Sequence, residues 1–254
     1  MYTNNRQPLI LDYIRKKKIV KVNELSEYFN VADMTVRRDL ICLEQNGLII
    51  RTHGGAMLAD YMSNSESTFI SRQIQNLPEK RIIAEKAVSF MEDNLAIYID
   101  GSTTCSEIAK ILPQKKNIMV FSDSIAALIE LRERLENITI VLAGGELARD
   151  NNTLDGHIAV ETAQKICVDV AFISCGGFSE EGITNTGLIG IQVKKIILNS
   201  AKTRILVADS SKYNRRCIYM LSGWDKINYL ISDGGLNTDE AKKIEKQGTE
   251  VLIV

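Results

Sequence analysis

The spacing of apolar residues divides the chain into two parts. Up to residue 58, apolar residues recur every three or four positions, which predicts amphipathic helices. From residue 95 onward, continuous apolar runs alternate with such helical patterns. The expected strands span 95–99, 118–121, 138–142, 168–174, 205–208, 227–231 and 251–254, and the expected helices span 105–112, 125–135, 158–166, 192–201 and 238–247. This alternation is typical of an α/β domain whose mainly parallel sheet is covered on both faces.

The first part of the chain predicts two helices before a turn. The helix from Leu9 ends in the basic cluster 15–18, and a short β-branched segment follows at 19–22. Asn23 has a side chain suited to capping the second helix. Asn30–Val31 then suit a turn.

A third helix begins near Ala32–Asp33. Its apolar residues are Met34, Val36, Leu40 and Leu43. The last three stand at i, i+4 and i+7, so they form one buried stripe.

A β-hairpin is expected after this helix. Gly47 suits the left-handed position that ends a helix, and a strand follows at 48–51. Gly54–Gly55 allow a tight return of the chain. Helix, turn, helix and hairpin in this order predict a winged helix-turn-helix that reads DNA.

Several polar residues of this region lie off the buried stripe. Residues near the N-terminus of a recognition helix contact bases and phosphates, and a wing contacts the backbone or minor groove. Arginine pairs with guanine through two hydrogen bonds, and threonine serves a base edge or a phosphate. Asp39 is expected to orient an arginine, since phosphates repel an unpaired carboxylate. The candidate DNA contacts are Lys21, Thr35, Arg37, Arg38, Arg51 and His53.

The distribution of charge supports this separation into two parts. The whole chain of 254 residues has a net charge of -1. Residues 1–58 carry nine Lys/Arg and six Asp/Glu, whereas the rest carries 22 and 26. A basic N-terminal segment followed by an acidic remainder is typical of a DNA-binding module joined to a domain that does not bind DNA.

Five scattered cysteines and two histidines limit the possible chemistry. No C-x-x-C pair occurs, so free thiols in a reducing cytoplasm are expected. His53 belongs to the wing and His157 flanks a helix, so neither a metal site nor a cofactor is expected. The N-terminus is polar and no apolar run approaches the 18 residues of a membrane span. The sequence therefore predicts a cytoplasmic protein without a membrane partner.

Small polar residues follow five of the expected strands. These loops are Asp100-Gly101-Ser102-Thr103-Thr104, Ser122-Asp123-Ser124, Ala143-Gly144-Gly145-Glu146, Cys175-Gly176-Gly177-Phe178 and Asp209-Ser210-Ser211-Lys212. In parallel sheets, ligands bind beyond the carboxyl ends of the strands. Glycines and hydroxyl residues at helix N-termini suit a phosphate, to which Lys212 adds a point charge. Asp100, Asp123 and Asp209 suit sugar hydroxyls. Capping and turn formation are the alternative role of these loops.

The motifs of both parts resemble the DeoR family of bacterial transcriptional regulators. The resemblance is carried by Val22, Glu24-Leu25-Ser26, Phe29-Asn30-Val31, Thr35-Val36-Arg37-Arg38-Asp39-Leu40, Leu43-Glu44, Gly47, His53-Gly54-Gly55-Ala56 and the strand-end loops. Ala32 departs from the Ser or Thr that usually caps the recognition helix. Gly190, Ile191 and Gln192 stand where family members often carry one or two glutamates before Val-Lys. If that acid helps to choose the effector, this protein's ligand differs from the familiar ones.

The resemblance implies three segments and two partners. Residues 1–58 would form the DNA-binding domain, 59–77 a linker and 78–254 an effector domain similar in fold to ribose-5-phosphate isomerase. The chain would be a homo-oligomer, a dimer or tetramer, that binds double-stranded operator DNA. A phosphorylated sugar or related metabolite would release it from a sugar uptake or catabolism operon. The implied pocket consists of Asp100, Gly101, Ser102, Thr103, Thr104, Ser122, Ser124, Gly144, Gly145 and Lys212.

Two alternatives compete with this interpretation. One is a sugar-phosphate isomerase or deaminase with a DNA-binding appendage. Proton transfer needs a well-placed carboxylate, and the loop at 175–178 has no acid before Glu180-Glu181, although Glu146 and Asp150 are available. The other is a thiol redox sensor using Cys105 or Cys175, since a helix N-terminus would lower the pKa of Cys105. No resolving partner is evident for either thiol.

Overall fold

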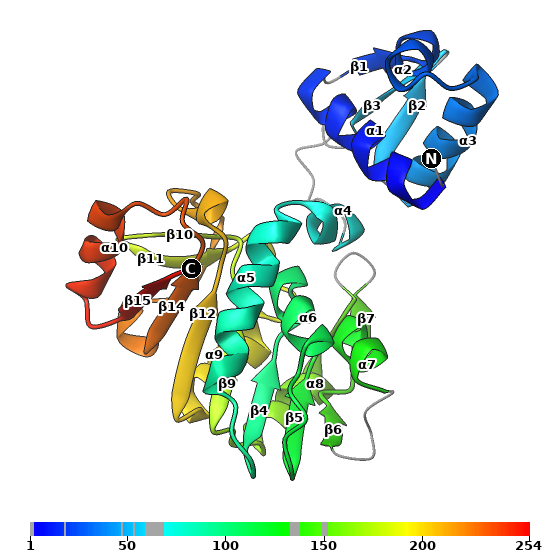
Figure 1. Ribbon diagram of the computed structural model, residues 1–254. Helices are drawn as coiled ribbons and strands as arrows, with labels where there is room; N and C mark the ends of the chain where they lie inside the picture. Colours follow the sequence, from blue (N-terminus) through cyan, green and yellow to red (C-terminus); the bar gives the residue numbers. More distant parts are fainter. Residues whose placement is uncertain are drawn as a thin grey trace. The chain divides into compact units, whose positions relative to one another are not determined.

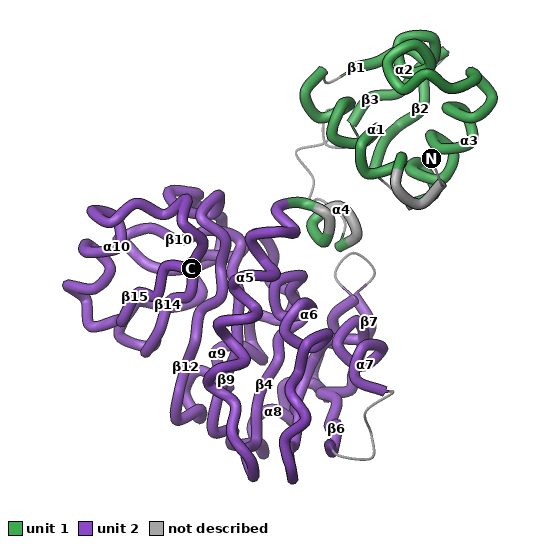
Figure 2. The backbone as a smooth tube through the Cα atoms, viewed as in Figure 1, with its two compact units in different colours: residues 1–75 green, residues 76–254 purple. Residues whose placement is uncertain are grey.

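The structure, a computed structural model, describes residues 3–17, 19–46, 48–52, 54–58, 69–132, 138–148 and 152–254. The chain divides into two compact units, Met1–Gln75 and Asn76–Val254 (Figure 2). The expected helix stop at Gly47, and residues 59–68 of the expected linker, lie outside the described residues.

Unit 1 has the winged helix-turn-helix order that the apolar spacing predicts. Its elements are α1 (Thr3–Lys17), β1 (Ile19–Lys21), α2 (Val22–Phe29), α3 (Asp33–Gln45), β2 (Ile49–Thr52), β3 (Gly55–Leu58) and α4 (Phe69–Ile74) (Figure 1). The strands form an antiparallel sheet in the order β1-β3-β2. Val36, Leu40 and Leu43 are buried as expected, against apolar residues of α1, α2 and the sheet. This packing fixes α3 against the rest of the unit.

One local expectation in unit 1 is wrong. Asn23 does not cap α2, because the helix begins at Val22 with Lys21 at the N-cap. The side chain of Asn23 instead accepts a hydrogen bond from the Glu24 amide at 3.0 Å. Met34, outside the expected stripe, is 75% exposed, since it precedes Val36 by only two residues and so points to another side of α3. The expected turn at Asn30 is present, with a left-handed φ of 50°.

Unit 2 is built around a seven-stranded parallel sheet in the order β15-β14-β12-β9-β4-β5-β6 (Figure 1). These strands are β4 (Ala96–Ile99), β5 (Ile118–Ser122), β6 (Ile138–Leu142), β9 (Val170–Ile173), β12 (Thr203–Val207), β14 (Tyr229–Ser232) and β15 (Glu250–Ile253). The helices are α5 (Leu77–Ala87), α6 (Thr103–Lys110), α7 (Ile125–Leu131), α8 (His157–Gln164), α9 (Ile191–Ser200) and α10 (Thr238–Glu245). The expected mainly parallel α/β domain is confirmed.

Each face of this sheet has its own apolar core. Residues of α5, α6 and α7 pack on one face around Ile97, Ile99 and Phe172. Residues of α8, α9 and α10 belong to the other core, which contains Tyr98 and Phe121. Successive residues of a strand point to opposite faces, so Tyr98 lies on the α9 side while Ile97 and Ile99 lie on the α5 side.

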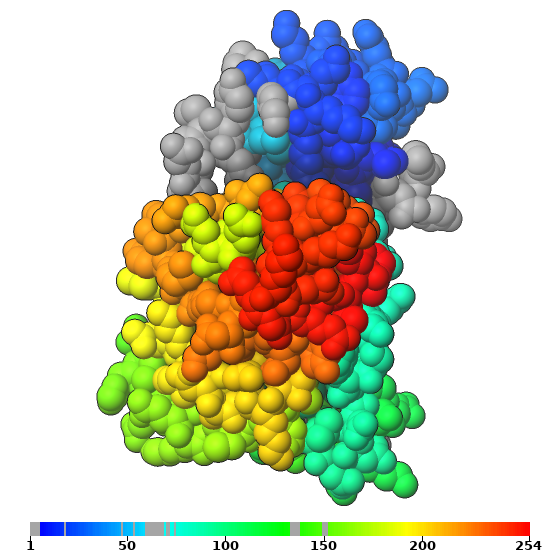
Figure 3. All heavy atoms as spheres, turned by 90° about the vertical axis from the view of Figure 1, so that its left-hand side faces the viewer, coloured from blue at the N-terminus to red at the C-terminus, as the bar shows by residue number. Residues whose placement is uncertain are grey.

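Short antiparallel strands, which the sequence did not predict, form two further sheets outside the seven-stranded sheet. β7 (Glu146–Ala148) pairs with β8 (Thr153–Asp155), and β10 (Gly177–Ser179), β11 (Gly182–Asn185) and β13 (Tyr219–Ser222) form a small sheet. Strands of three or four residues are too short for an apolar alternation to reveal them. Figure 3 shows the red C-terminal segment, which contains α10 and β15, at the surface of unit 2 beside the orange segment before it.

Candidate functional site

The recognition helix α3 presents its basic residues to solvent. Arg37 and Arg38 are exposed and Thr35 is half-buried, while Val36 and Leu40 are fully buried on the other side. Two adjacent guanidinium groups are therefore available on one surface of unit 1. This is the arrangement that contacts with bases and phosphates require.

Asp39 pairs with an arginine, as expected, but the partner comes from α1. Its carboxylate accepts a hydrogen bond from Arg6 Nε at 2.6 Å and one from Gln7 Nε2 at 3.5 Å. Arg6 and Asp39 are both buried, at 5% and 1% exposure. The ion pair therefore ties α1 to α3 instead of orienting Arg37 or Arg38.

The remaining DNA candidates of unit 1 lie outside α3. Arg51, on β2, donates through Nε to Glu44 Oε2 at 2.7 Å, and this hydrogen bond lowers the pKa of the Glu44 carboxyl. Lys21 is exposed at the end of β1. His53 lies outside the described residues.

In unit 2, the five polar loops follow five adjacent strands, β12, β9, β4, β5 and β6. All pairs within this set are parallel, so the loops meet at one edge of the sheet. The structure thus brings together the loops that the sequence singled out over more than a hundred positions.

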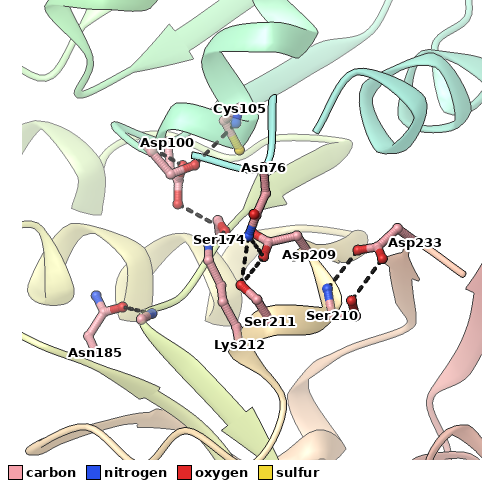
Figure 4. Close-up of polar contacts among 12 residues, drawn as sticks. Asn76, Asp100, Cys105, Ser174, Asn185, Asp209, Ser210, Ser211, Lys212 and Asp233 are labelled. Carbon is pink, nitrogen blue, oxygen red and sulfur yellow. Dashed lines mark hydrogen bonds and ion pairs between the residues drawn. The ribbon is translucent and has the colours of Figure 1, made fainter. Parts of the chain in front are cut away.

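Asp100 lies at the centre of these loops and forms a buried ion pair. Its Oδ2 accepts a hydrogen bond from the Ser174 amide at 2.7 Å (Figure 4). The same oxygen is 2.7 Å from Lys194 Nζ on α9, while Oδ1 accepts from the Ser102 amide. Burial alone would raise the pKa of the Asp100 carboxyl, but Lys194 and these hydrogen bonds lower it overall. Lys194 also donates to the Ser174 carbonyl at 3.0 Å. The sequence did not single out Lys194 as a site residue, because its partner lies far away along the chain.

Lys212 belongs to a second group of contacts at the same edge. Its Nζ donates to Ser174 Oγ at 3.1 Å and lies 3.9 Å from Asp209 Oδ2 (Figure 4). Asn76 Nδ2 donates to Asp209 Oδ1 and to Ser211 Oγ, each at 2.8 Å. Burial would raise the pKa of Asp209, but Lys212 and the hydrogen bonds from Ser211 and Asn76 lower it. The lysine is thus linked through Asp209 to Asn76, the first residue of unit 2.

The hydroxyl candidates have structural roles within the described residues. Ser102 caps α6 by accepting from the Cys105 amide at 3.2 Å, and Ser124 caps α7 by accepting from the Ala127 amide at 3.1 Å. Ser122 Oγ donates to the Ile99 carbonyl at 2.7 Å. Thr103 and Thr104 are buried in the first turn of α6, where the amides lack partners inside the helix. These contacts agree with the alternative role of the loops in capping and turn formation, and the anion-binding role of the hydroxyl residues stays a prediction.

The glycine candidates keep the loops close to neighbouring backbone and side chains. A Cβ on Gly101 would lie 2.3 Å from Thr153 Oγ1, and one on Gly145 would lie 2.3 Å from the Asp155 carbonyl oxygen. Gly144 and Gly145 also have positive φ values of 73° and 92°. A larger residue at Gly101 or Gly145 would push the loops apart.

The expectation that the helix N-terminus lowers the pKa of Cys105 is wrong, and neither thiol of the redox alternative has a lowered pKa. Cys105 is fully buried, and burial raises the pKa of its thiol well above the ordinary value despite the nearby helix N-terminus. Burial also raises the pKa of Cys175 to about 11. Both thiols are therefore protonated at neutral pH and poor nucleophiles.

Other classes of site were sought in the part of the chain that the structure describes. There, no three or more His, Cys, Asp or Glu side chains are grouped to hold a metal ion. Among the same residues, no helix has both the length and the apolar character to cross a membrane.

Comparisons with known proteins agree with this architecture. Residues 6–61 match a DeoR-like helix-turn-helix domain and residues 75–234 a DeoR C terminal sensor domain. An HTH-type transcriptional regulator of Haemophilus influenzae is 31% identical over 100% of this chain and 98% of its own length. The HTH-type transcriptional repressor GlcR of Bacillus subtilis is 31% identical over 100% of this chain and 97% of its own. Ribose 5-phosphate isomerase A of Methanocaldococcus jannaschii is 18% identical, with a TM-score of 0.41 over 55% of each chain. The chain belongs to the DeoR family of helix-turn-helix transcriptional regulators.

Proposed function

We propose that the protein is a repressor of a sugar uptake or catabolism operon, released from its operator by a phosphorylated sugar. The observation that carries the proposal is the position of Lys212. Its ammonium group lies at the edge where five polar loops meet, and its side chain keeps 18% exposure, so it can reach an incoming anion. Lys194, by contrast, is neutralised by Asp100 at 2.7 Å.

The DNA-binding half of the proposal rests on the surface of α3. Arg37 and Arg38 would contact the operator together with Thr35, while Arg51, Lys21 and His53 would contact the flanking backbone. A homo-oligomer, either dimer or tetramer, would present two or more such units to repeated half-sites. Pairing of units raises affinity through effective concentration.

Release follows from competition for Lys212. A phosphate that pairs with Lys212 draws the ammonium group away from Asp209, 3.9 Å distant. Asp209 also holds Asn76, the residue at which unit 2 begins. A change in that contact alters how the chain leaves unit 2 toward the DNA-binding unit. The effector shifts the population of the two states by no more than its difference in affinity for them.

Within this proposal, the sensor unit binds its effector without turning it over. The relatives described above are transcriptional regulators. The loop after β9 consists of Ser174-Cys175-Gly176, so it contributes no carboxylate for proton transfer, and the Cys175 thiol has a pKa of about 11. Incubation with ribose 5-phosphate should yield no ketose, and formation of the product would favour the isomerase alternative.

The direct test uses DNA release by a panel of phosphorylated sugars. A labelled operator fragment, selected from random duplexes, is titrated with the full chain, and each sugar phosphate is then added. The Lys212→Ala variant should bind the operator fragment with unchanged affinity, but no added sugar phosphate should release it from the fragment. Lys202→Ala is the matched control, because Lys202 is exposed and pairs with Asp169 at 2.7 Å, away from the polar loops. Normal release of Lys212→Ala would remove the proposed anion site.

A further inference from the structure

Two fully buried polar side chains near the strand-end loops lack hydrogen-bond partners among the described residues. They are Asp123, with both carboxylate oxygens, and Tyr98, with its hydroxyl group. Both residues are 0% exposed. Buried polar groups in folded proteins are almost always hydrogen-bonded. The Tyr98 hydroxyl faces the Asp123 carboxylate, but the carboxylate keeps acceptor positions that no group of the described residues fills with a hydrogen bond of full geometry.

Among the described residues, the Asp123 carboxylate faces the Tyr98 hydroxyl and has no ion pair of its own. Asp100 next to it already occupies Lys194, at 2.7 Å. Burial, and then the charge of Asp100, raise the pKa of the Asp123 carboxyl to about 7, although Lys194 opposes this. The nearby carboxylates, together with burial, keep the Tyr98 hydroxyl protonated by raising its pKa. An ionised Asp123 thus offers acceptors beside a hydroxyl that can donate.

Glycine at position 190 brings backbone directly against this carboxylate. A Cβ there would lie 3.3 Å from Asp123 Oδ2 and 3.4 Å from Thr153 Cγ2. Gly190 ends an exposed turn that includes Leu188, 59% exposed, and its amide donates to Asp155 Oδ2 at 3.1 Å. Apart from the local backbone bonds of Gly190 and Leu188 with the first turn of α9, the turn is held by this bond to Asp155, and its displacement would open the carboxylate to a ligand.

The chemistry of the pair selects among possible ligand groups. A hydroxyl group can donate its proton to Asp123 while its oxygen accepts from Tyr98. An ammonium group has no lone pair for the Tyr98 proton, and a phosphate is repelled by the carboxylate. A hydroxyl is therefore the group that uses both side chains.

We propose that Asp123 and Tyr98 form a hydroxyl-binding subsite that holds the sugar end of a ligand whose phosphate lies at Lys212. Lys212 Nζ lies at Ser174, directly after β9, and Tyr98 is on the adjacent strand β4. Neighbouring strands are roughly 5 Å apart, so a span of one to two strands, roughly 5–10 Å, suits a phosphorylated monosaccharide. The inference rests on the proposed function, and it orients the ligand with its phosphate at Lys212 and a sugar hydroxyl at Asp123 and Tyr98.

The test measures binding to the full chain at pH 8 by isothermal titration calorimetry. The probes are ribose 5-phosphate, fructose 1-phosphate, fructose 6-phosphate and glucose 6-phosphate, with inorganic phosphate as the anion-only probe and glucosamine 6-phosphate as the ammonium probe. For the sugar phosphate that binds best, Asp123→Asn should weaken binding at least tenfold and leave the affinity for inorganic phosphate unchanged. Charge-assisted hydrogen bonds are about twice as strong as neutral ones, which sets the size of this loss.

Tyr98→Phe is the second variant, because it removes only the hydroxyl and keeps the ring packed at 5.7 Å from Phe121. It should weaken sugar phosphate binding severalfold. Tyr229→Phe is the matched control, because it makes the same change on β14, where the ring packs on Phe90, and it should change nothing.

The outcomes separate this subsite from the proposed function. Sugar phosphate binding that both variants leave intact, or that falls in step with inorganic phosphate, overturns the subsite alone. Tighter binding of glucosamine 6-phosphate than of glucose 6-phosphate likewise overturns it in favour of an ammonium ligand. If no sugar phosphate binds the unaltered chain, the proposed function fails and the subsite fails with it.

Discussion

Replacing Asp123 by asparagine should make the sensor unit less sensitive to pH. The substitution keeps the shape of the side chain and removes its titration. The folded-state pKa of about 7 exceeds the value of about 3.9 expected in the unfolded chain. The folded protein therefore holds this proton more tightly, so folding is most favoured at low pH. Stability is lost as the pH rises from about 4 to about 7.

The size of the effect follows from the two pKa values. Each pKa unit corresponds to about 1.36 kcal/mol, so ionising Asp123 between pH 5 and pH 8 costs the unaltered protein roughly 3 kcal/mol. The buried amide of the Asp123→Asn variant also lacks hydrogen-bond partners, which lowers the stability of the variant. Because the amide does not titrate, this loss of stability is the same at both pH values. The stability of the variant relative to the unaltered protein should therefore rise by roughly 3 kcal/mol between pH 5 and pH 8. In melting temperature, this is roughly 6–12 °C for a unit of this size.

Trp224 provides the assay, because it is the single tryptophan of the chain and is buried in unit 2. Urea unfolding is followed by its fluorescence at pH 5 and at pH 8. Asp169→Asn is the control, since Lys202 and the Ala96 amide lower the pKa of Asp169, whose stabilising effect is complete above about pH 5. The free energy of unfolding of Asp123→Asn minus that of the unaltered protein should be larger at pH 8 than at pH 5. An equal or smaller value at pH 8 would refute the reasoning.

Three further predictions concern the DNA-binding surface and its connection to the sensor. Arg38→Ala should cost about 1–3 kcal/mol of specific operator binding in fluorescence anisotropy if the side chain reads a base, and an unchanged footprint would exclude that role. Asn76→Ala removes both hydrogen bonds to the loop that contains Asp209, so operator affinity should persist while release by effector weakens. Arg6→Ala should cost about 3–5 kcal/mol because it leaves the buried Asp39 carboxylate without its cation. Circular dichroism should show a lower melting temperature for Arg6→Ala than for the unaltered chain. Equal melting curves would contradict the stabilising role of the Arg6–Asp39 pair.

The sequence predicted most of the elements because their signals are local. Apolar runs such as 118–121 identify buried strands, and the stripe of Val36, Leu40 and Leu43 identifies the packed side of α3. The order of these elements was sufficient to predict a parallel sheet behind a winged helix-turn-helix. The five polar loops could also be placed at one edge, because the strands of a parallel sheet end on the same side.

What the sequence did not reveal depends on contacts between distant residues. The ion pair of Asp100 with Lys194 spans 94 positions, and nothing in the spacing of either residue marks the other. The hydrogen bond from Asn76 to Asp209 likewise joins residues that lie far apart in the sequence. The N-cap of α2 was misplaced because a capping side chain at Asn23 does not by itself fix where the helix begins. The roles of the candidate DNA and pocket residues stay predictions.

The position of Asn76 has a consequence for grafting this sensor onto other proteins. The contact boundary falls between Gln75 and Asn76, and the sensor-domain match begins at residue 75. A chimera that joins a foreign DNA-binding head at residue 76 keeps the amide that ties the junction to the loop after β12. A fusion that starts two residues later, at Pro78, discards that amide while sparing nearly all of α5. The two fusions should therefore differ in inducibility. The effector should release the first from its DNA, whereas the second should stay bound to its DNA when the effector is added.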